Sequence, residues 1–166
     1  MITERDAISI IKKANIEGIN VWIDGGWGVD ALLEKQTRDH NDIDLVIEMK
    51  NYLNFIDLIK REGFYEVKES YTSTYHTVWH DIHNRIIDLH LVEFDEEGIA
   101  HYENDVYPPG SLSATGKIDG IEVCCVSAQA QILFHLGYEH DENDIHDVML
   151  LCKKFDIPIP DEYRNI

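Results

Sequence analysis

Apolar residues recur every three or four positions in several segments of the chain, and this spacing predicts amphipathic helices. In the first segment, Ala7, Ile8 and Ile11 lie between charged residues. The helical spacing is found over 4–17, 28–35, 53–62, the stretch that follows Ser127, and 143–155. Ser127 is expected to cap the helix that it precedes.

Shorter runs rich in β-branched and aromatic residues predict strands. These runs are 19–24, 43–47, 64–68, 74–80, 85–94 and 121–126. Short polar links join the three runs between 64 and 94, which favours antiparallel neighbours. Asp119-Gly120 is typical of a hairpin turn. The pattern predicts the α/β class, in its α+β form, with a mixed sheet flanked by helices and a small helical part near the C-terminus.

The length of 166 residues suits one compact unit, and no long linker interrupts it. Within this unit, 1–166, we expect a sheet core over 1–105. A C-terminal hairpin and helical part is expected over 106–166.

Composition and charge exclude several classes of protein. A hydrophobic fraction of 44% argues against disorder, and no run approaches the roughly 18 apolar residues that a membrane span needs. The formal net charge of −18 repels nucleic acid and anionic membranes and attracts cations. The N-terminus lacks the pattern of a signal peptide and the chain has only three cysteines, so we expect a cytoplasmic protein.

The stretch V-W-I-D-G-G-W-G-V-D-A, from Val21 to Ala31, reads as a strand, a glycine turn and the start of a helix. Its segment from Gly26 to Ala31 fits G-x-G-x-x-[G/A], the fingerprint of dinucleotide-binding domains. Such a domain needs a parallel second strand with one acidic residue near its end. Here the helix is short, the later strands are antiparallel, and the second strand brings two acids. The dinucleotide interpretation is therefore disfavoured.

Three aspartates on two predicted strands indicate a metal site. Asp42 and Asp44 are two positions apart, so in an extended chain both side chains leave the same face. Two adjacent carboxylates repel each other unless a cation lies between them, which makes the pair suited to a divalent metal. Asp88 adds a third carboxylate from the apolar run 85–91. Exposure to solvent is the better explanation for any one of the three, but all three beside a Gly-Gly turn favour a functional site.

A Gly-Gly turn, then D-I-D, then a strand acid in I-D-L-H resembles the pattern of the DNA polymerase β-like nucleotidyltransferase superfamily. The longer run from Val21 to Leu45, together with I-L-F-H-L-G-Y from Ile132 to Tyr138, resembles the lincosamide nucleotidyltransferases of antibiotic resistance. Their close relatives are the aminoglycoside 2''-nucleotidyltransferases. The resemblance implies the polymerase β-like fold and transfer of AMP from ATP, with Mg²⁺, to a hydroxyl group of an antibiotic.

The resemblance also implies roles for the matching residues. Asp42, Asp44 and Asp88 correspond to the metal-binding and catalytic carboxylates, with Asp88 as general base for the acceptor hydroxyl. Gly25 and Gly26 correspond to the turn whose N–H groups approach the phosphates. Members of the superfamily often have serine at the second position, so a hydroxyl contact is missing at Gly26.

Six further candidates lie near these motifs. Those for nucleotide contact are Trp27, Arg38 and His40, and those for acceptor contact are His90, Glu93 and Tyr138. Basic residues are scarce, so Arg38 in the loop before the D-x-D pair is suited to phosphate, although it also fits a solvated loop charge. His90 and Glu93 fit structural hydrogen bonds equally well. Phe134 is expected in the core.

Three histidines, His76, His80 and His83, raise the question of zinc. They lie on one predicted strand and its turn, without an H-E-x-x-H motif, so no zinc site is expected from them.

We therefore expect an O-nucleotidyltransferase that modifies a lincosamide. The alternatives are an aminoglycoside as acceptor, AMPylation of a protein, and a nucleotide-binding regulator without catalysis. The regulator is disfavoured because degenerate members usually lose an acid, and all three acids are present. Expected partners are the antibiotic and a nucleoside triphosphate, without nucleic acid or membrane, and a homodimer is left open.

Overall fold

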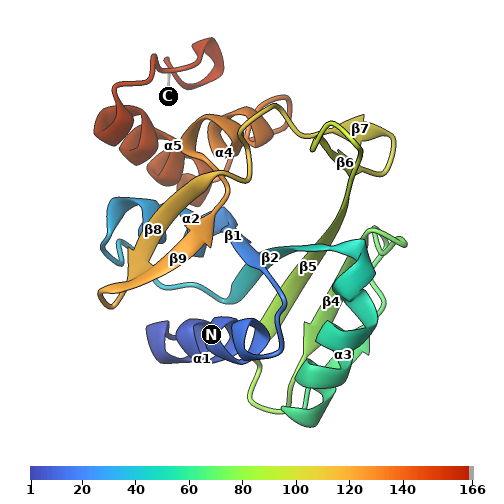
Figure 1. The fold of residues 1–166 in the computed structure, drawn as a ribbon. Helices are drawn as coiled ribbons and strands as arrows, with labels where there is room; N and C mark the ends of the chain where they lie inside the picture. The colour runs from blue at the N-terminus through green and yellow to red at the C-terminus, as the bar shows by residue number, and fades with distance from the viewer. Residues whose placement is uncertain (165–166) are drawn as a thin grey trace.

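The computed structural model describes residues 1–164. The helices are α1 (Glu4–Ile16), α2 (Gly25–Leu33), α3 (Tyr52–Arg61), α4 (Ala128–Phe134) and α5 (Glu142–Phe155), with 3-10 turns at Met49–Asn51 and Asp161–Tyr163. The strands are β1 (Val21–Asp24), β2 (Asp42–Glu48), β3 (Tyr65–Val67), β4 (His76–His80), β5 (Ile86–Phe94), β6 (Ala100–Tyr102), β7 (Asp105–Val106), β8 (Ala114–Ile118) and β9 (Ile121–Cys125). Figure 1 shows their arrangement.

The sheet is mixed, as the sequence predicts. Its order is β3-β4-β5-β2-β1-β9-β8, and β6 and β7 continue from β5. β2 runs parallel to β5, and β1 runs parallel to β9. β1 and β2 are antiparallel neighbours, whereas a dinucleotide-binding domain requires a parallel pair joined through the helix. The glycine fingerprint therefore belongs to a different fold.

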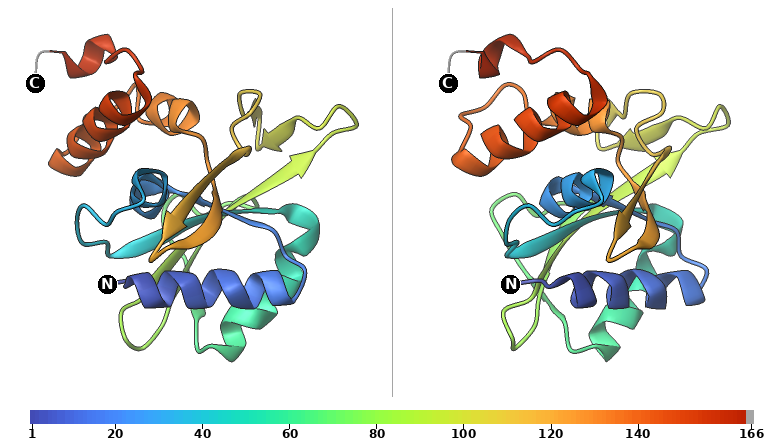
Figure 2. Two further views of the ribbon diagram at one scale, coloured as in Figure 1. Left: turned by 60° about the vertical axis from the view of Figure 1, so that its left-hand side comes forward. Right: turned by 90° about the vertical axis from the view of Figure 1, so that its left-hand side faces the viewer.

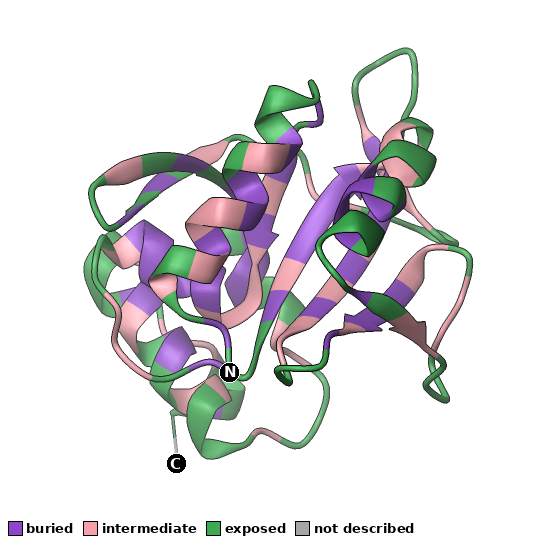
Figure 3. Ribbon diagram, turned by 90° about the horizontal axis from the view of Figure 1, so that it is seen from below, coloured by how far each residue is buried: buried purple, intermediate pink, exposed green. Residues whose placement is uncertain are grey.

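The two faces of the central strands differ in chemistry. On one face, alternate residues such as Ile43 and Leu89 are fully buried in the main core, together with apolar residues of α1 and α3. These two helices lie along the same side of the sheet (Figures 1 and 2). The other face carries Val46 and Val92, which pack with Ala130 of α4. The same face of β2 and β5 carries Asp44 and Asp88. Figure 3 shows the buried residues as bands along the strands and the inward sides of the helices.

Four helices begin at side-chain caps, and the cap of α2, Asp24, is described below. Thr3 and Asp6 form a capping box at α1, and Asp141 and Asp144 form another at α5. The hydroxyl of Ser127 accepts the N–H of Ala130 at the start of α4, as predicted. Each cap pairs N–H groups that the first turn of a helix leaves free.

The structure corrects four details of the sequence prediction. α2 begins at Gly25 rather than near residue 28, because Asp24 is extended and caps it. The hairpin of β6 and β7 occupies part of a segment predicted as irregular. α4 ends at Phe134, so Tyr138 lies in the following loop. Phe134 is 36% exposed and is not a core residue.

The predicted division into a sheet core, 1–105, and a C-terminal hairpin and helical part, 106–166, stays a prediction. β8 and β9 form the predicted hairpin, but β9 pairs with β1 and so extends the same sheet. Within residues 1–164, no helix has the length and apolar character needed to span a membrane.

Candidate active site

Three aspartates lie side by side on three neighbouring strands. Asp24 at the end of β1 is in register with Asp44 of β2, and Asp44 is in register with Asp88 of β5. Asp42 is two residues before Asp44 and shares its face of the strand, because Ile43 between them is buried in the core on the other face. The fold thus brings together the three predicted carboxylates and adds Asp24 to them.

These carboxylates carry uncompensated negative charge. Burial, followed by the charges of Asp42, Asp88 and Asp24, raises the pKa of Asp44 well above its ordinary value. Burial also raises the pKa of Asp24, although its carboxylate accepts the N–H of Gly25 at 2.9 Å. In the part of the chain that the structure describes, no lysine or arginine forms an ion pair with any of the four. The site is therefore suited to a cation from solution.

The backbone of Gly25 and Gly26 packs closely against neighbouring side chains. Gly25 has a φ of +55°, and a Cβ atom there would collide with the carboxylate of Asp44. A Cβ atom on Gly26 would collide with Arg38 and His40. The site therefore has no room for the serine that the superfamily often places at the second position.

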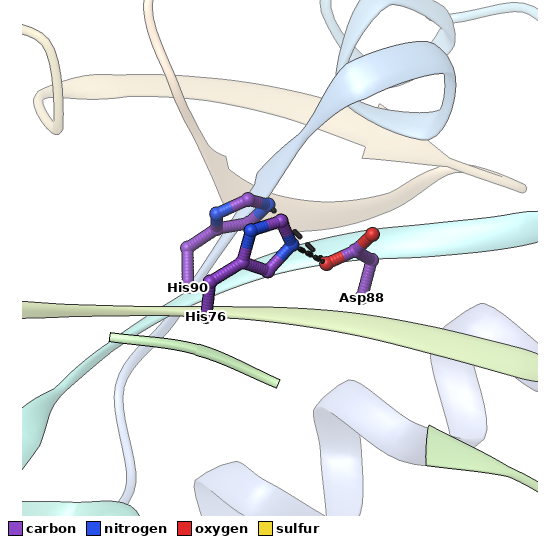
Figure 4. Close-up of side chains that lie close together, drawn as sticks. All are labelled: His76, Asp88 and His90. Atoms are coloured by element: carbon purple, nitrogen blue, oxygen red, sulfur yellow. Dashed lines mark hydrogen bonds and ion pairs between the residues drawn. The ribbon is translucent and has the colours of Figure 1, made fainter. Parts of the chain in front are cut away.

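Asp88 lies next to two histidines (Figure 4). The Nε2 atom of His76, from β4, is hydrogen-bonded to Oδ1 of Asp88. The Nε2 atom of His90 is 3.6 Å from the same oxygen and 4.0 Å from Oδ1 of Asp44. Burial lowers the pKa of His90 to about 4, so its imidazole is neutral near pH 7.

Behind the glycine turn, a second group of charged residues is paired. Arg38 binds Asp147 of α5 with two nitrogens, at 3.1 Å from Nε to Oδ1 and 2.7 Å from Nη2 to Oδ2. The Nε2 atom of His40 is 2.6 Å from Oδ2 of Asp30, and both side chains are 2% exposed. The ring of His40 is 4.6 Å from that of Trp27, which is 1% exposed. The side chains of Trp27 and His40 thus support the turn from inside the protein.

A cavity of about 410 Å³ opens beside the turn, a volume suited to a small ligand. It lies between the glycine turn, the start of β2, the end of α4 and the start of α5. Its wall is formed by Asp24, Gly25, Gly26, Arg38, Asp39, Asn41, Asp42, Asp44, Phe134, His135, Asp141, Asn143, Asp144 and Asp147. Of the three predicted nucleotide-contact side chains, Arg38 lines this cavity.

The residues predicted to contact the acceptor lie in three different places. His90 is next to Asp88, as described above. Val92 lies on the same face of β5 as His90, so strand alternation places Glu93 on the opposite face. The carboxylate of Glu93 accepts a hydrogen bond from the hydroxyl of Tyr75 at 2.7 Å. Tyr138 is 48% exposed in the loop after α4. Of the three, His90 is the one that the fold brings to the aspartates.

Aromatic rings form a continuous row from His90 to the cavity. The ring of His90 is 5.8 Å from that of Tyr102, which is 6.1 Å from that of Tyr107. The ring of Tyr107 is 4.9 Å from that of Phe134, one of the cavity residues. The strands β6 and β7, absent from the sequence prediction, position the first part of this row.

Three residues of the site were not found by sequence reasoning. Asp24 directly precedes the two glycines, and its register with Asp44 follows once β1 and β2 are paired. His76 was weighed only with the other histidines of its own strand, whereas its partner lies across the sheet. For Asp147, 109 positions from Arg38 in the sequence, no local signal existed.

Comparison with known proteins agrees with this geometry. The family model of the aminoglycoside-2''-adenylyltransferases matches residues 7–151. A lincosamide resistance protein of Staphylococcus haemolyticus is 28% identical over 152 residues, which are 89% of this chain and 92% of that protein. A 2''-aminoglycoside nucleotidyltransferase of Escherichia coli is 29% identical over 138 residues, 80% of this chain and 72% of that protein.

Solved structures show the same fold. The lincomycin-bound crystal structure of the lincosamide antibiotic adenylyltransferase LnuA has a TM-score of 0.82 and 25% identity, covering 95% of this chain and 99% of that one. The complex of ANT(2'')-Ia with adenylyl-2''-tobramycin has a TM-score of 0.79 and 24% identity, covering 92% and 88%. The chain is therefore a nucleotidyltransferase by fold and by sequence, and it belongs to the aminoglycoside-2''-adenylyltransferase family.

Proposed function

We propose that this enzyme transfers AMP from ATP to a hydroxyl group of a lincosamide and releases pyrophosphate. The row of aspartates beside a glycine turn carries this proposal, because it combines clustered carboxylates with a backbone cradle suited to phosphate. The cavity lined by Asp24, Asp42 and Asp44 is large enough for a small ligand.

The residues at the site fit a magnesium ion. Carboxylate oxygens are the ligands that Mg²⁺ takes in proteins, together with phosphate oxygens of the substrate. Burial and then the charges of the neighbouring carboxylates raise the pKa of Asp44, so a cation bound between them would relieve their repulsion. Asp42 and Asp44 would hold the ion, with Asp88 beside them. When bound, Mg²⁺ would neutralise phosphate charge and orient the phosphates.

Asp88 is assigned as the general base. The acceptor hydroxyl oxygen forms a bond to the α-phosphorus, the bond from phosphorus to the pyrophosphate oxygen breaks, and the hydroxyl proton moves to a carboxylate oxygen of Asp88. His76 holds Oδ1 of this carboxylate by a hydrogen bond, which fixes its orientation. Gly25 and Gly26 present their backbone to the phosphates, and Arg38 provides positive charge at the cavity wall.

Two observations favour a lincosamide over an aminoglycoside. The match covers 92% and 99% of the two lincosamide proteins but 72% and 88% of the two aminoglycoside proteins. The row of rings from His90 to Phe134 offers apolar surface, which suits an acceptor with one basic amine. The net charge of −18 favours the polycationic aminoglycosides instead, so these remain the second candidate.

A mass measurement separates the two acceptors. The protein is incubated with ATP and Mg²⁺ and with either lincomycin or kanamycin, and each antibiotic is examined for the added mass of AMP. We expect lincomycin to gain this mass and kanamycin to remain unchanged. Modification of kanamycin alone would overturn the assignment of the acceptor, and modification of neither would overturn the proposed reaction.

A further inference from the structure

His76 and His90 add two imidazoles beside Asp88, and neither belongs to the carboxylates proposed to hold magnesium. One ligand atom from each of these three residues lies within 4.8 Å of the other two. The three side chains are only 18–20% exposed, so they are largely shielded from solvent. Figure 4 shows both imidazoles directed toward the carboxylate.

The sheet fixes this arrangement. His76 and His90 are cross-strand neighbours on β4 and β5, and their ring centroids are 4.3 Å apart. Asp88 is two residues before His90 on the same face of β5, because Leu89 between them is buried in the main core. The three ligands therefore come from two paired strands rather than from mobile loops.

The donor set selects a different class of ion from that at Asp42 and Asp44. Imidazole nitrogen is a ligand for zinc and related transition metals, whereas Mg²⁺ prefers carboxylate, phosphate and water oxygens. Zinc bound at about 2.0–2.2 Å to nitrogen and oxygen requires ligand atoms about 3.4 Å apart. The 3.6 Å from His90 Nε2 to Asp88 Oδ1 is close to this spacing, and all three ligand atoms lie within 4.8 Å of one another.

We infer that His76, Asp88 and His90 bind a zinc-class transition metal ion, with two imidazole nitrogens and one carboxylate oxygen as protein ligands. Zinc replaces the hydrogen bond between His76 and Asp88, and water completes its coordination. An ion at this position binds the carboxylate that the proposed reaction uses as base. Zinc is therefore expected to inhibit the magnesium-dependent reaction. The binding itself does not depend on the proposed acceptor.

The test is a titration of the full-length protein with Zn²⁺ in competition with a chromophoric chelator, without ATP or antibiotic. We expect one tightly bound ion per chain, retained in a millimolar excess of Mg²⁺. His76→Asn and His90→Asn should each weaken binding by at least about tenfold. His83→Asn is the matched control, because His83 is exposed at the end of the same hairpin, and it should bind as the wild type does.

A second measurement keeps the test valid if a histidine variant does not fold. Co²⁺ added to the wild-type protein should give the visible absorption bands of a low-symmetry nitrogen and oxygen site, and Zn²⁺ should abolish them. Absence of a stoichiometric ion in the wild type would overturn the inference, as would equal weakening by His83→Asn. Because neither measurement needs catalysis, a negative result here leaves the proposed function intact, and a failed antibiotic assay leaves zinc binding intact.

Discussion

Two groups of aspartates flank the Gly25-Gly26 turn, and they are treated differently by the fold. Behind the turn, Asp30 and Asp147 are almost completely buried, and each is paired, with His40 and with Arg38. On the sheet, the aspartates of β1, β2 and β5 lie in register with one another and, within residues 1–164, have no lysine or arginine partner. We expect the first group to stabilise the fold, and the second is the one proposed to bind cations and substrate.

The unpaired aspartates on the sheet are expected to lower the stability of the folded protein. A buried ion pair is compensated inside the protein, whereas Asp44 is surrounded by other carboxylates and its pKa is raised. Function commonly maintains such unfavourable local arrangements. Variants of the two groups should therefore have opposite effects on activity and stability.

The largest effect is expected for Asp88→Asn. The amide cannot accept the proton of the acceptor hydroxyl, so turnover should fall by about 10² to 10⁴-fold. ATP affinity should change little, because Asp42, Asp44 and the glycine turn remain. The measurements are kcat for AMP transfer and an equilibrium titration with ATP.

Asp57→Asn is the control for this substitution, since it makes the same change at an exposed position of α3. It should leave both quantities as in the wild type. If Asp88→Asn retains normal turnover, Asp88 is not the base.

The sequence predicts the placement of residues that are close together in the chain, but not the pairing of residues that are far apart in it. Asp42 and Asp44 were placed correctly on one face because strand alternation is a local property. The partners Arg38 and Asp147 are 109 positions apart and depend on how α5 docks. The position of His40 two residues before the D-x-D pair predicts a nucleotide contact. The sequence does not reveal that His40 is buried against Asp30.

Local sequence patterns also limit which helices and strands can be predicted. The long helices and the strands of the sheet follow from periodic patterns that are strong in any context. β6 and β7 have only three and two residues, too few for a period to be recognised, although they position part of the aromatic row. The start of α2 at Gly25 depends on a cap and a left-handed φ, which local composition did not reveal.

The next largest effect is expected for Asp147→Asn. It leaves Arg38 without a full counter-charge at a position where Arg38 is 23% exposed and Asp147 is 3% exposed. Breaking a buried pair typically costs 3–5 kcal/mol, and the partial exposure of Arg38 favours the lower end, about 3 kcal/mol. Urea denaturation measures this loss as a decrease in the free energy of unfolding.

Asp39→Asn is the control, at an exposed position next to Arg38, and it should change the free energy of unfolding by less than about 0.5 kcal/mol. Equal stability of the two variants would show that the pair is not structural.

The smallest effect, with the opposite sign, is expected for Asp44→Asn in protein free of metal. The pKa of Asp44 is raised in the folded state above 3.8, so the folded protein binds this proton more tightly than the unfolded chain does. Stability from this group is present below pH 3.8 and is lost as the pH rises through the folded pKa. At pH 7 the ionised carboxylate is therefore unfavourable, and Asp44→Asn should raise the stability by about 1 kcal/mol, or Tm by about 3 °C.

Thermal unfolding at several pH values, with and without Mg²⁺, tests this sign. The excess stability of Asp44→Asn should decrease as the pH is lowered toward 3.8, where both proteins carry an uncharged group at this position. Mg²⁺ should raise Tm of the wild type by binding the folded state, and should raise that of the variant much less. A variant that is less stable than the wild type at pH 7 without metal would show that Asp44 has a partner inside the protein. The contrast between the paired and the unpaired aspartates would then be lost.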